Sequence, residues 1–308
     1  MGLSDSSQGR RLLDDRLRKV SDDVNTKEGL KSMIPKLCNV VSSDRAIDEY
    51  YSVTGVGDIP AFNGSLTTLQ RFPGYHKKIE SGEFAAQMVT QKKFLEDERY
   101  GVLENNAKSL MKAVHRTQEK KLVNVFANIT SVAFDFMESE EGVSLSSDSH
   151  TTKAEGVSTS TGFDNAGTSA MSATSIAATR LLMRRFKDDI GERFGMGDNL
   201  AIICPENLAD TAEEVNRTPS GMNTADGNVN MNRGRYEVIP YPLLDDYSTT
   251  SWGIVDKDAM KESLIWINRV APEAKNTIDW NTYAWMQAIR ARFGVGFIDW
   301  RWIFWHTV

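Results

Sequence analysis

The sequence has little of the chemistry on which catalysis and metal binding usually depend. Its 308 residues include four histidines and two cysteines, and none of them has the spacing of a zinc site or of a His-Glu-x-x-His motif. Cys38 and Cys204 lie too far apart along the chain for a CxxC pair, which predicts neither a disulfide framework nor a thiolate metal site and fits a reducing compartment. We therefore expect no metal ion and no cofactor.

Long apolar runs and an excess of basic charge are also missing. No stretch of about eighteen apolar residues is present, so no membrane span is expected, and the first residues lack the basic and apolar regions of a secretory signal. The 36 Lys and Arg residues are outnumbered by 42 Asp and Glu, which gives a formal net charge of −6 and argues against a dedicated nucleic-acid-binding protein. The sequence predicts a protein that is made in the cytoplasm.

One short segment combines a candidate nucleophile with a candidate base. In Ser146-Ser-Asp-Ser-His150, Ser149 and His150 are the residue types that a hydrolase would use. Side chains so close along the chain seldom reach the geometry of a triad, and Ser and Asp are frequent in turns. The glycine-containing stretches lack both the third glycine of a dinucleotide-binding loop and the Gly-Lys-Ser/Thr ending of a phosphate loop. We expect no enzyme and assign no catalytic residue.

The first 47 residues predict a helical arm with a narrow apolar face. Apolar residues recur at helical spacing, between densely alternating acidic and basic residues, at Leu13, Leu17, Val20 and Val24. A stripe that is one apolar side chain wide does not stabilise a helix by itself. We therefore expect this segment to lie on a partner surface, which is either the domain's own surface or that of another chain.

Residues 48–96 predict a long two-stranded excursion. The segment 51–60 is rich in Tyr, Val and Ile and is interrupted by glycine, as a bent strand would be. A returning strand is indicated by the alternate positions Phe84, Ala86, Met88 and Thr90. Between the two lie the strong turn signals Asn63-Gly64 and Phe72-Pro-Gly-Tyr75. Because an isolated two-stranded ribbon is marginal in water, the excursion must lie against its own domain or another chain.

The clearest predicted element is a helix from Asp97 to Ile129. Its apolar residues keep a spacing of three and four, while charged residues occupy the other faces. At 1.5 Å per residue such a helix is about 50 Å long. We expect it to be a spine that packs against a sheet.

The second half of the chain predicts a mixed domain and an aromatic C-terminal sheet. We expect a helix from Ser169 to Lys187, a buried strand at Leu200–Cys204 and a helix that begins at Pro205. The Asn- and Gly-rich tract from Thr218 to Gly234 predicts a long loop. All seven tryptophans lie at or after Trp252, and apolar residues alternate along the segments that follow. The C-terminus should therefore be part of the core.

Several motifs follow one another along the chain from Val56 to Arg301. They are Val56-Gly-Asp-Ile-Pro-Ala-Phe-Asn-Gly64, Phe72-Pro-Gly-Tyr75, Leu95-Glu-Asp-Glu-Arg-Tyr-Gly101, Ser146-Ser-Asp-Ser-His150, Val229-Asn-Met-Asn-Arg233, Arg235-Tyr-Glu-Val-Ile-Pro-Tyr-Pro242 and Ile298-Asp-Trp-Arg301. From Tyr50 to its C-terminus the chain resembles the Hong Kong 97-type tailed-phage major capsid proteins, and most of all the Mu-like major head subunit family.

The resemblance implies an α+β protein with the Hong Kong 97-type capsid fold. Its parts would be an N-terminal arm (1–47), an extended loop (48–96), a peripheral domain with a spine helix (97–164), an axial domain (165–269) and C-terminal strands that return to the peripheral domain (270–308). The arm would be either an ordinary capsid arm or the remnant of a scaffolding segment that some relatives remove.

The resemblance also implies a function. The chain would be a major capsid protein that self-assembles into the pentamers and hexamers of an icosahedral phage shell enclosing double-stranded DNA. Its partners would be copies of itself, a portal protein, scaffolding or decoration proteins and non-specifically bound DNA, in a virion capsid assembled in the host bacterial cytoplasm. Phe62, Phe72 and Tyr75 would contact the neighbouring subunit. Two alternatives are left, an encapsulin-like cellular nanocompartment with the same fold and a hydrolase that uses Ser149 and His150.

Overall fold

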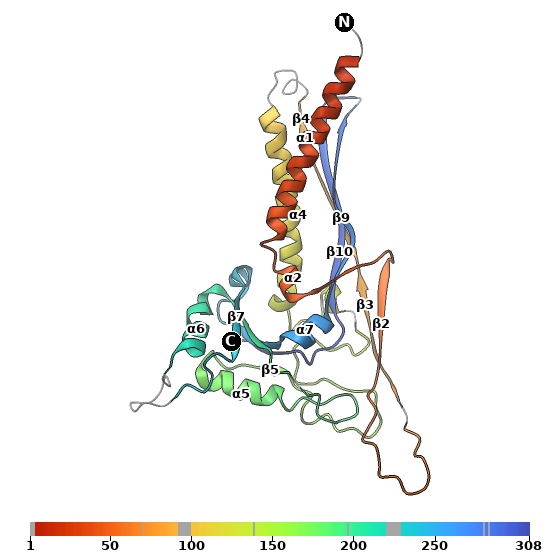
Figure 1. Ribbon diagram of the computed structural model, residues 1–308, viewed down its shortest axis with the longest axis vertical. Helices are drawn as coiled ribbons and strands as arrows, with labels where there is room; N and C mark the ends of the chain where they lie inside the picture. The colour runs from red at the N-terminus through yellow and green to blue at the C-terminus, as the bar shows by residue number, and fades with distance from the viewer. Residues whose placement is uncertain are drawn as a thin grey trace.

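Two sheets, a separate hairpin and one long helix form the framework of the computed structural model (Figure 1). It describes residues 4–69, 71–91, 100–137, 139–195, 197–219, 229–279, 281–282 and 284–308. The first sheet contains, in spatial order, β1 (Asn39–Ser42), β9 (Leu264–Ile278), β10 (Trp285–Phe297) and β4 (Gly82–Thr90). The second contains β5 (Ala166–Gly167), β11 (Ile303–His306), β8 (Trp252–Asp256), β6 (Leu200–Cys204) and β7 (Tyr236–Pro240). The hairpin is formed by β2 (Ile47–Val53) and β3 (Pro73–Glu80).

Long helices lie along one face of the first sheet, and shorter helices lie beside the second (Figure 1). Their bounds are α1 (Ser4–Gly29), α2 (Ile34–Leu37), α4 (Tyr100–Ala127), α5 (Ala173–Met183), α6 (Ala209–Arg217) and α7 (Lys257–Ser263). Three short 3₁₀ helices are η1 (Asp135–Met137), η2 (Glu206–Leu208) and η3 (Pro242–Asp246).

Helix α4 confirms the predicted spine, although residues 97–99 of the prediction lie outside the described residues. It spans 28 residues, about 42 Å at 1.5 Å per residue. Its buried positions keep the predicted spacing at Leu103, Ala107, Leu110, Val114, Leu122 and Val125. The helix packs against β10 and β4, so its apolar face and the sheet form one core.

Helix α1 lies along α4, so its partner surface belongs to its own chain (Figure 1). Its narrow stripe is buried at Leu17 and Val24, while the side chain of Leu13 lies outside the described residues. Leu17 packs in a small cluster with Leu103, Ala107 and Trp285. Of the two partner surfaces that the sequence left open, the structure shows the intrachain one.

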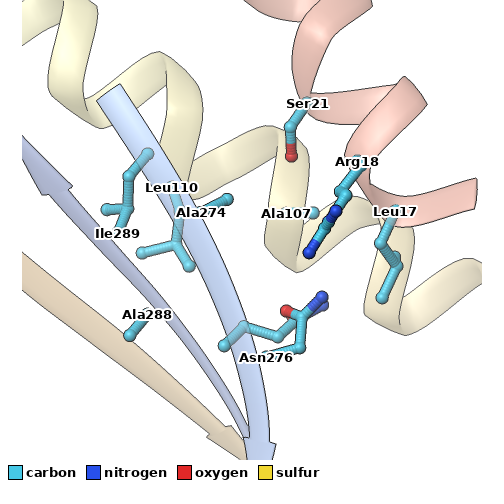
Figure 2. A pocket seen from close by; sticks show the side chains of 10 residues that line it. Leu17, Arg18, Ser21, Ala107, Leu110, Ala274, Asn276, Ala288 and Ile289 are labelled. Atoms are coloured by element: carbon cyan, nitrogen blue, oxygen red, sulfur yellow. The ribbon is translucent and has the colours of Figure 1, made fainter. Parts of the chain in front are cut away.

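Polar contacts and a narrow cavity complete the contact between α1 and α4. The Nε atom of Arg16 lies 2.5 Å from a Glu104 oxygen, and His115 Nε2 lies 2.8 Å from Asn25 Oδ1. Figure 2 shows the cavity where the two helices meet β9 and β10; it is lined by Leu17, Arg18, Ser21, Ala107, Leu110, Ala274, Asn276, Gln287, Ala288 and Ile289. A single apolar stripe and a few polar contacts therefore hold the arm in place.

The predicted pairing of residues 84–90 with residues 51–60 is wrong. Strand β4 pairs antiparallel with β10, with Phe84 opposite Ala291, while β3 is the strand that pairs with β2. The ring of Phe84 stacks on that of Phe293 with centroids 4.4 Å apart. The alternation that suggested a ribbon is thus the face of a sheet that lies against α4, and the second half of the predicted excursion belongs to the first sheet.

The C-terminal strands of segment 270–308 were expected to return to the peripheral domain. Strand β10 pairs with β9 and β4 in the sheet that packs against α4, but β11 does not join that sheet. Strand β11 pairs with β5 and β8 in the second sheet. All four of its residues are buried, and a strand that is apolar on both faces needs cover on both. Strand β9 also runs through the predicted boundary at residue 269.

The predicted strand Leu200–Cys204 is confirmed as β6, whereas the predicted helix Ser169–Lys187 is shorter in the structure, where α5 spans Ala173–Met183. Helix α5 begins after Ser172, whose hydroxyl accepts a hydrogen bond of 3.1 Å from the Ser175 amide. Such a cap fixes the start of a helix by satisfying one of its free amides. After Pro205 the short helix η2 precedes α6. Residues 220–228 of the predicted loop lie outside the described residues.

Two glycines of β10 allow the end of β3 to lie directly against this strand. A Cβ atom on Gly294 would be 2.5 Å from the carbonyl oxygen of Glu80, and one on Gly296 would be 2.6 Å from Cγ1 of Ile79. The hairpin therefore meets the first sheet at a place where only glycine fits, and this contact sets where the hairpin leaves the body.

Replacing Gly294 with alanine should destabilise the fold by about 1–3 kcal/mol, because backbone atoms must move to accept the methyl group. The matched control is Gly101→Ala in α4, where an added Cβ meets nothing within 4 Å and helix propensity favours alanine by about 1 kcal/mol. Urea unfolding of both variants measures the difference. Equal stabilities of the two variants would contradict the close approach of β3.

His306 is a buried neutral histidine at the end of β11 in the second sheet. Its Nδ1 accepts a hydrogen bond of 3.1 Å from the Ser169 amide, and its Nε2 lies 2.7 Å from the Thr179 hydroxyl oxygen. That hydroxyl donates to the Ser175 carbonyl, so Nε2 carries the proton and donates. Burial lowers the pKa of His306 to about 4.

The unfolded chain takes up a proton on His306 below about pH 6.5, whereas the folded chain resists it down to about pH 4. The neutral ring therefore contributes stability that is complete above pH 6.5 and is lost as the pH falls toward 4, in total roughly 3 kcal/mol. His306→Gln should be less stable at pH 7 but lose less stability between pH 6.5 and 4. Melting temperatures of both proteins across this range test this; parallel pH profiles would contradict it.

Candidate assembly surfaces

The loop that joins β2 to β3 projects away from the rest of the molecule (Figure 1). Among its described residues, 54–69 and 71–72, none belongs to a helix or strand, and Gly64 provides the left-handed turn with a φ of +103°. Five large apolar residues are exposed along it, namely Val56, Ile59, Phe62, Leu66 and Leu69. Apolar side chains gathered on a projecting segment are typical of a protein–protein contact. We call residues 54–72 the exposed loop.

The structure separates the three predicted contact residues. Phe62 lies on the exposed loop and is 73% exposed. Phe72 closes the base of the loop, since its amide donates to the Thr54 hydroxyl at 2.8 Å and its carbonyl accepts from the Thr54 amide at 2.9 Å. Tyr75 is half-buried, and its hydroxyl lies 2.7 Å from that of Thr151 on the same chain. Contact of these residues with a neighbour stays a prediction, and Phe62 is the one of the three that presents an exposed ring.

Sequence reasoning missed the two most exposed apolar residues of the loop. Ile59 is 88% exposed and Leu66 is 91% exposed. Both lie in the same stretch of turn-forming residues as Phe62. Apolar residues that belong to no helical or alternating pattern are expected to be exposed, and this signal could have identified Ile59 and Leu66 as well as the aromatic residues.

The hairpin is fastened to the body through Glu140. This carboxylate accepts hydrogen bonds from the His76 amide at 3.1 Å and from its ring Nδ1 at 3.0 Å, and Lys153 lies 2.5 Å from its other oxygen. The Lys153 ammonium and then the His76 contacts lower the pKa of Glu140 to about 2. The backbone amide of Glu140 also donates to the His76 carbonyl at 3.1 Å, so β3 is held by both side chain and backbone.

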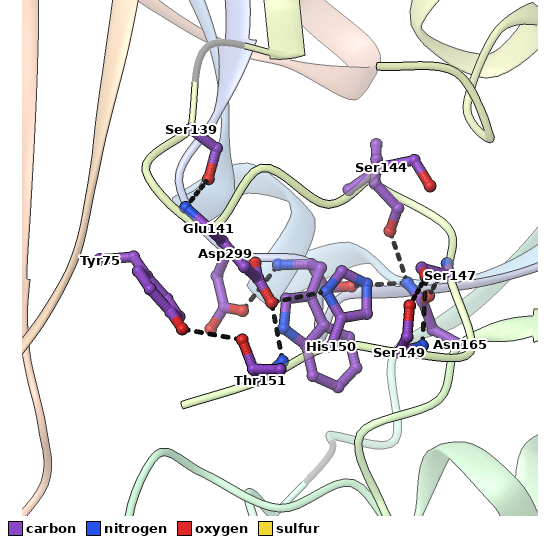
Figure 3. A network of polar contacts seen from close by, with 12 residues as sticks. Tyr75, Ser139, Glu141, Ser144, Ser147, Ser149, His150, Thr151, Asn165 and Asp299 are labelled. Carbon is purple, nitrogen blue, oxygen red and sulfur yellow. Dashed lines mark hydrogen bonds and ion pairs between the residues drawn. The ribbon is translucent and has the colours of Figure 1, made fainter. Parts of the chain in front are cut away.

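The next residue, Glu141, forms a buried counterpart (Figure 3). Its carboxylate lies 3.1 Å from His150 Nδ1, 2.9 Å from the Thr151 amide and 4.0 Å from Lys77 Nζ. Burial raises the pKa of Glu141, but the bond to His150 and the other contacts outweigh it, so the pKa is lowered. Burial lowers the pKa of Lys77 to about 8 against the opposing effect of Glu141. Two adjacent carboxylates thus fix the base of the hairpin.

This arrangement also shows that Ser149 and His150 do not form a nucleophile and base. The Ser149 hydroxyl lies 3.0 Å from the Ser147 hydroxyl, whereas His150 pairs with Glu141. The His150 ring stacks on Trp300 with centroids 4.2 Å apart, and its side chain is 1% exposed. A buried imidazole that orders a loop has no access to a substrate, and the hydrolase alternative is wrong.

The described ranges offer no group of three or more His, Cys, Asp or Glu side chains placed to hold a metal ion. Cys38 and Cys204 are both buried and free, and burial raises the pKa of each thiol, that of Cys204 to about 12. Among the helices of the described part, none combines the length and apolar character needed to cross a membrane.

Solved structures share this architecture at low sequence identity. A structure of Mycobacterium phage Patience has a TM-score of 0.59 and 9% identity over 94% of this chain and 86% of its own. The capsid asymmetric unit of cyanophage Pam1 has a TM-score of 0.53 and 8% identity over 85% and 84%. A virus-like particle from Pyrococcus furiosus has a TM-score of 0.51 and 9% identity over 95% of this chain and 98% of its own. The spine helix, the projecting hairpin and the two sheets therefore have the arrangement of the Hong Kong 97-type fold.

The sequence shows the family to which the chain belongs. The model of the family described as phage capsid protein matches residues 86–306, well over half of the chain, and the chain belongs to that family. No curated protein sequence matches it. The protein is a major capsid protein with a structural, non-enzymatic role, as predicted.

Replacing Lys77 with methionine should change how stability depends on pH. The folded chain releases the Lys77 proton at about pH 8, whereas the unfolded chain holds it to about pH 10.5, so stability should rise between these values by roughly 3 kcal/mol. Lys77→Met should lose this rise, measured as the difference in melting temperature from the unsubstituted protein between pH 7 and 10. The control is Lys78→Met, whose partly exposed ammonium lies 3.6 Å from Glu49. If the difference in melting temperature between Lys77→Met and the unsubstituted protein stays constant from pH 7 to 10, the pKa of Lys77 is not lowered in the folded protein and the prediction is wrong.

Proposed function

We propose that this major capsid protein assembles into the pentamers and hexamers of an icosahedral phage shell that encloses double-stranded DNA. The exposed loop is the observation that carries the proposal, because five apolar side chains among its described residues are exposed to solvent while its base is fixed. A contact between different surfaces of identical subunits builds a ring when it closes, and rings joined by further contacts build a shell. The partners of the loop are therefore copies of the same chain.

The proposed parts of the subunit differ from the predicted boundaries at β4, β9 and β11. The extended loop comprises the β2–β3 hairpin and ends before β4, which joins α4 and most of β9 and β10 in the peripheral domain. The axial domain, around the five-fold and six-fold axes, comprises the second sheet with α5 and α6 and includes β11. Val229 and Met231, in the described end of the predicted loop Thr218–Gly234, are 73% and 68% exposed, which supports a subunit contact at these two residues.

The remaining partners follow from a phage shell of this kind. A portal protein would occupy one vertex, scaffolding or decoration proteins would bind the inner or outer surface, and the packaged DNA would be contacted without sequence recognition. Assembly would take place in the cytoplasm of the bacterial host, and the mature location would be the virion.

A cellular nanocompartment is the second candidate, because the virus-like particle from Pyrococcus furiosus shares the fold over 95% of this chain. The match to the phage capsid family favours the phage shell. The two differ in what the shell contains. Particles purified from the native source should carry DNA and a portal protein; an enzyme cargo without either would favour the compartment.

Removing the apolar character of the exposed loop should prevent assembly without unfolding the subunit. The triple variant Ile59→Ser, Phe62→Ser, Leu66→Ser should keep its melting temperature within a few degrees, since these side chains are exposed, and fail to form closed particles. Light scattering and negative-stain microscopy measure this. The control, Leu30→Ser with Val132→Ser, changes residues that are 81% and 61% exposed elsewhere and should assemble. Normal particles from the triple variant would contradict the role of the loop.

A further inference from the structure

Helix α4 exposes a line of cations on the side that faces away from the sheet. Lys108, Lys112, Arg116 and Lys120 follow one another at every fourth position, and all four are exposed. Each step advances about 6 Å along the helix axis, so the line is about 18 Å long. Residues 105–118 contain no Asp or Glu. We call these four residues the α4 basic line.

The acidic residues of α4 are engaged elsewhere and do not neutralise this line. Glu104 pairs with Arg16 at 2.5 Å, and Glu119 accepts hydrogen bonds from the Ser32 hydroxyl and, at 3.0 Å, from the Met33 amide. Within the described ranges, none of the four cations of the line forms an ion pair or a side-chain hydrogen bond. Their charges are available to a partner.

The opposite face of the sheet shows a different arrangement. There the cations are paired with acids, Arg290 with Glu83 at 2.6 Å, Arg292 with Glu83 at 4.0 Å, and Lys275 with Glu273 at 3.7 Å. The two faces of the same helix–sheet layer thus differ in charge: on one face three cations share two carboxylates, and on the other the four cations of the α4 basic line have no paired acid within the described ranges.

An exposed helix face is usually solvated, but such faces mix both signs. Helix α1 does so, since Arg16, Arg18 and Lys19 alternate with Asp15, Asp22 and Asp23. Like charges four residues apart destabilise a helix, and a chain with a formal net charge of −6 has no general excess of cations to distribute. Four cations without an acid in one line therefore indicate a polyanionic partner.

We infer that the α4 basic line binds the phosphate backbone of the enclosed duplex DNA, and that the α4 face of the subunit therefore points into the shell. The inference rests on the proposed function, in which the shell encloses DNA. Lys ammonium groups on flexible stems and a single Arg suit regularly spaced phosphates and read no base sequence. Each phosphate that is neutralised releases condensed counterions, which makes such binding weaken with salt.

Unassembled subunits and a short fluorescent DNA duplex provide the test. The variant K108Q/K112Q/R116Q/K120Q should bind at least about tenfold more weakly at about 50 mM salt, and the slope of log K against log salt should fall in magnitude by about 3–4, at about 0.9 per phosphate contact. The control K36Q/R45Q/R185Q/R233Q removes the same charge from exposed positions outside α4 and should keep both values. Equal binding by the two variants, or none by the unsubstituted subunit, would overturn the inference.

Closed particles test the orientation. They should leave added duplex unbound until they are opened, whereas binding by closed particles that depends on the four cations would place the α4 face outside. An acidic protein segment is the competing occupant; the quadruple variant would then bind DNA normally but assemble abnormally, which overturns the DNA assignment. If the unsubstituted chain forms no particles, the proposed function fails, while the binding of DNA by subunits still decides the role of the line.

Discussion

Strand β10 is paired with a neighbouring strand on each edge and packs against α4 on one face. The positions of the spine helix and of the hairpin depend on it. It pairs with β9 on one edge and with β4 on the other, while Ile289 and Phe293 are buried toward α4. Near its end, Gly294 and Gly296 lie against the end of β3. A shift of one residue would turn the buried side chains outward and move the glycines away from β3. The register of this strand therefore sets where the spine helix lies, where the hairpin leaves and where β11 enters the second sheet.

The elements that could be predicted are those whose signals are local. The spacing of apolar residues predicted α4, and the aromatic C-terminal segment predicted a buried end, which β11 confirms. The partner of β4 could not be predicted, because alternation shows that one face of a strand is buried but does not show which strand lies beside it. The same limit applied to β11, because the aromatic residues at the C-terminus indicated burial without indicating which sheet they join.

The candidate contact site also has one part that the sequence could predict and one that it could not. The exposed loop could be located from its turn residues and its isolated apolar side chains, because nothing distant determines their exposure. The fastening of its base could not, since Glu140 and Glu141 look like a solvated pair until the fold brings His76, Lys77 and His150 to them. Ser149 and His150 were considered as a candidate nucleophile and base because their partners in the fold cannot be seen in the sequence. The pairing of His150 with Glu141 and the stacking of Trp300, from the far end of the chain, on its imidazole show that this histidine is structural.

A subunit that must hold its neighbours benefits from a fixed base and an uncovered loop. Ordering a mobile segment weakens each contact that it makes, and the contacts of Glu140 and Glu141 hold the hairpin strands before any neighbour arrives. If the apolar residues of the loop were instead packed on their own body, they would stabilise the monomer and offer nothing to a second copy. The charges follow the same division, since the cations on the sheet face opposite α4 pair with Glu83 and Glu273, whereas the α4 basic line forms no ion pair within the described ranges. Because the uncovered apolar residues and the unpaired cations lie on different elements, a protein neighbour and a polyanion can be bound at the same time.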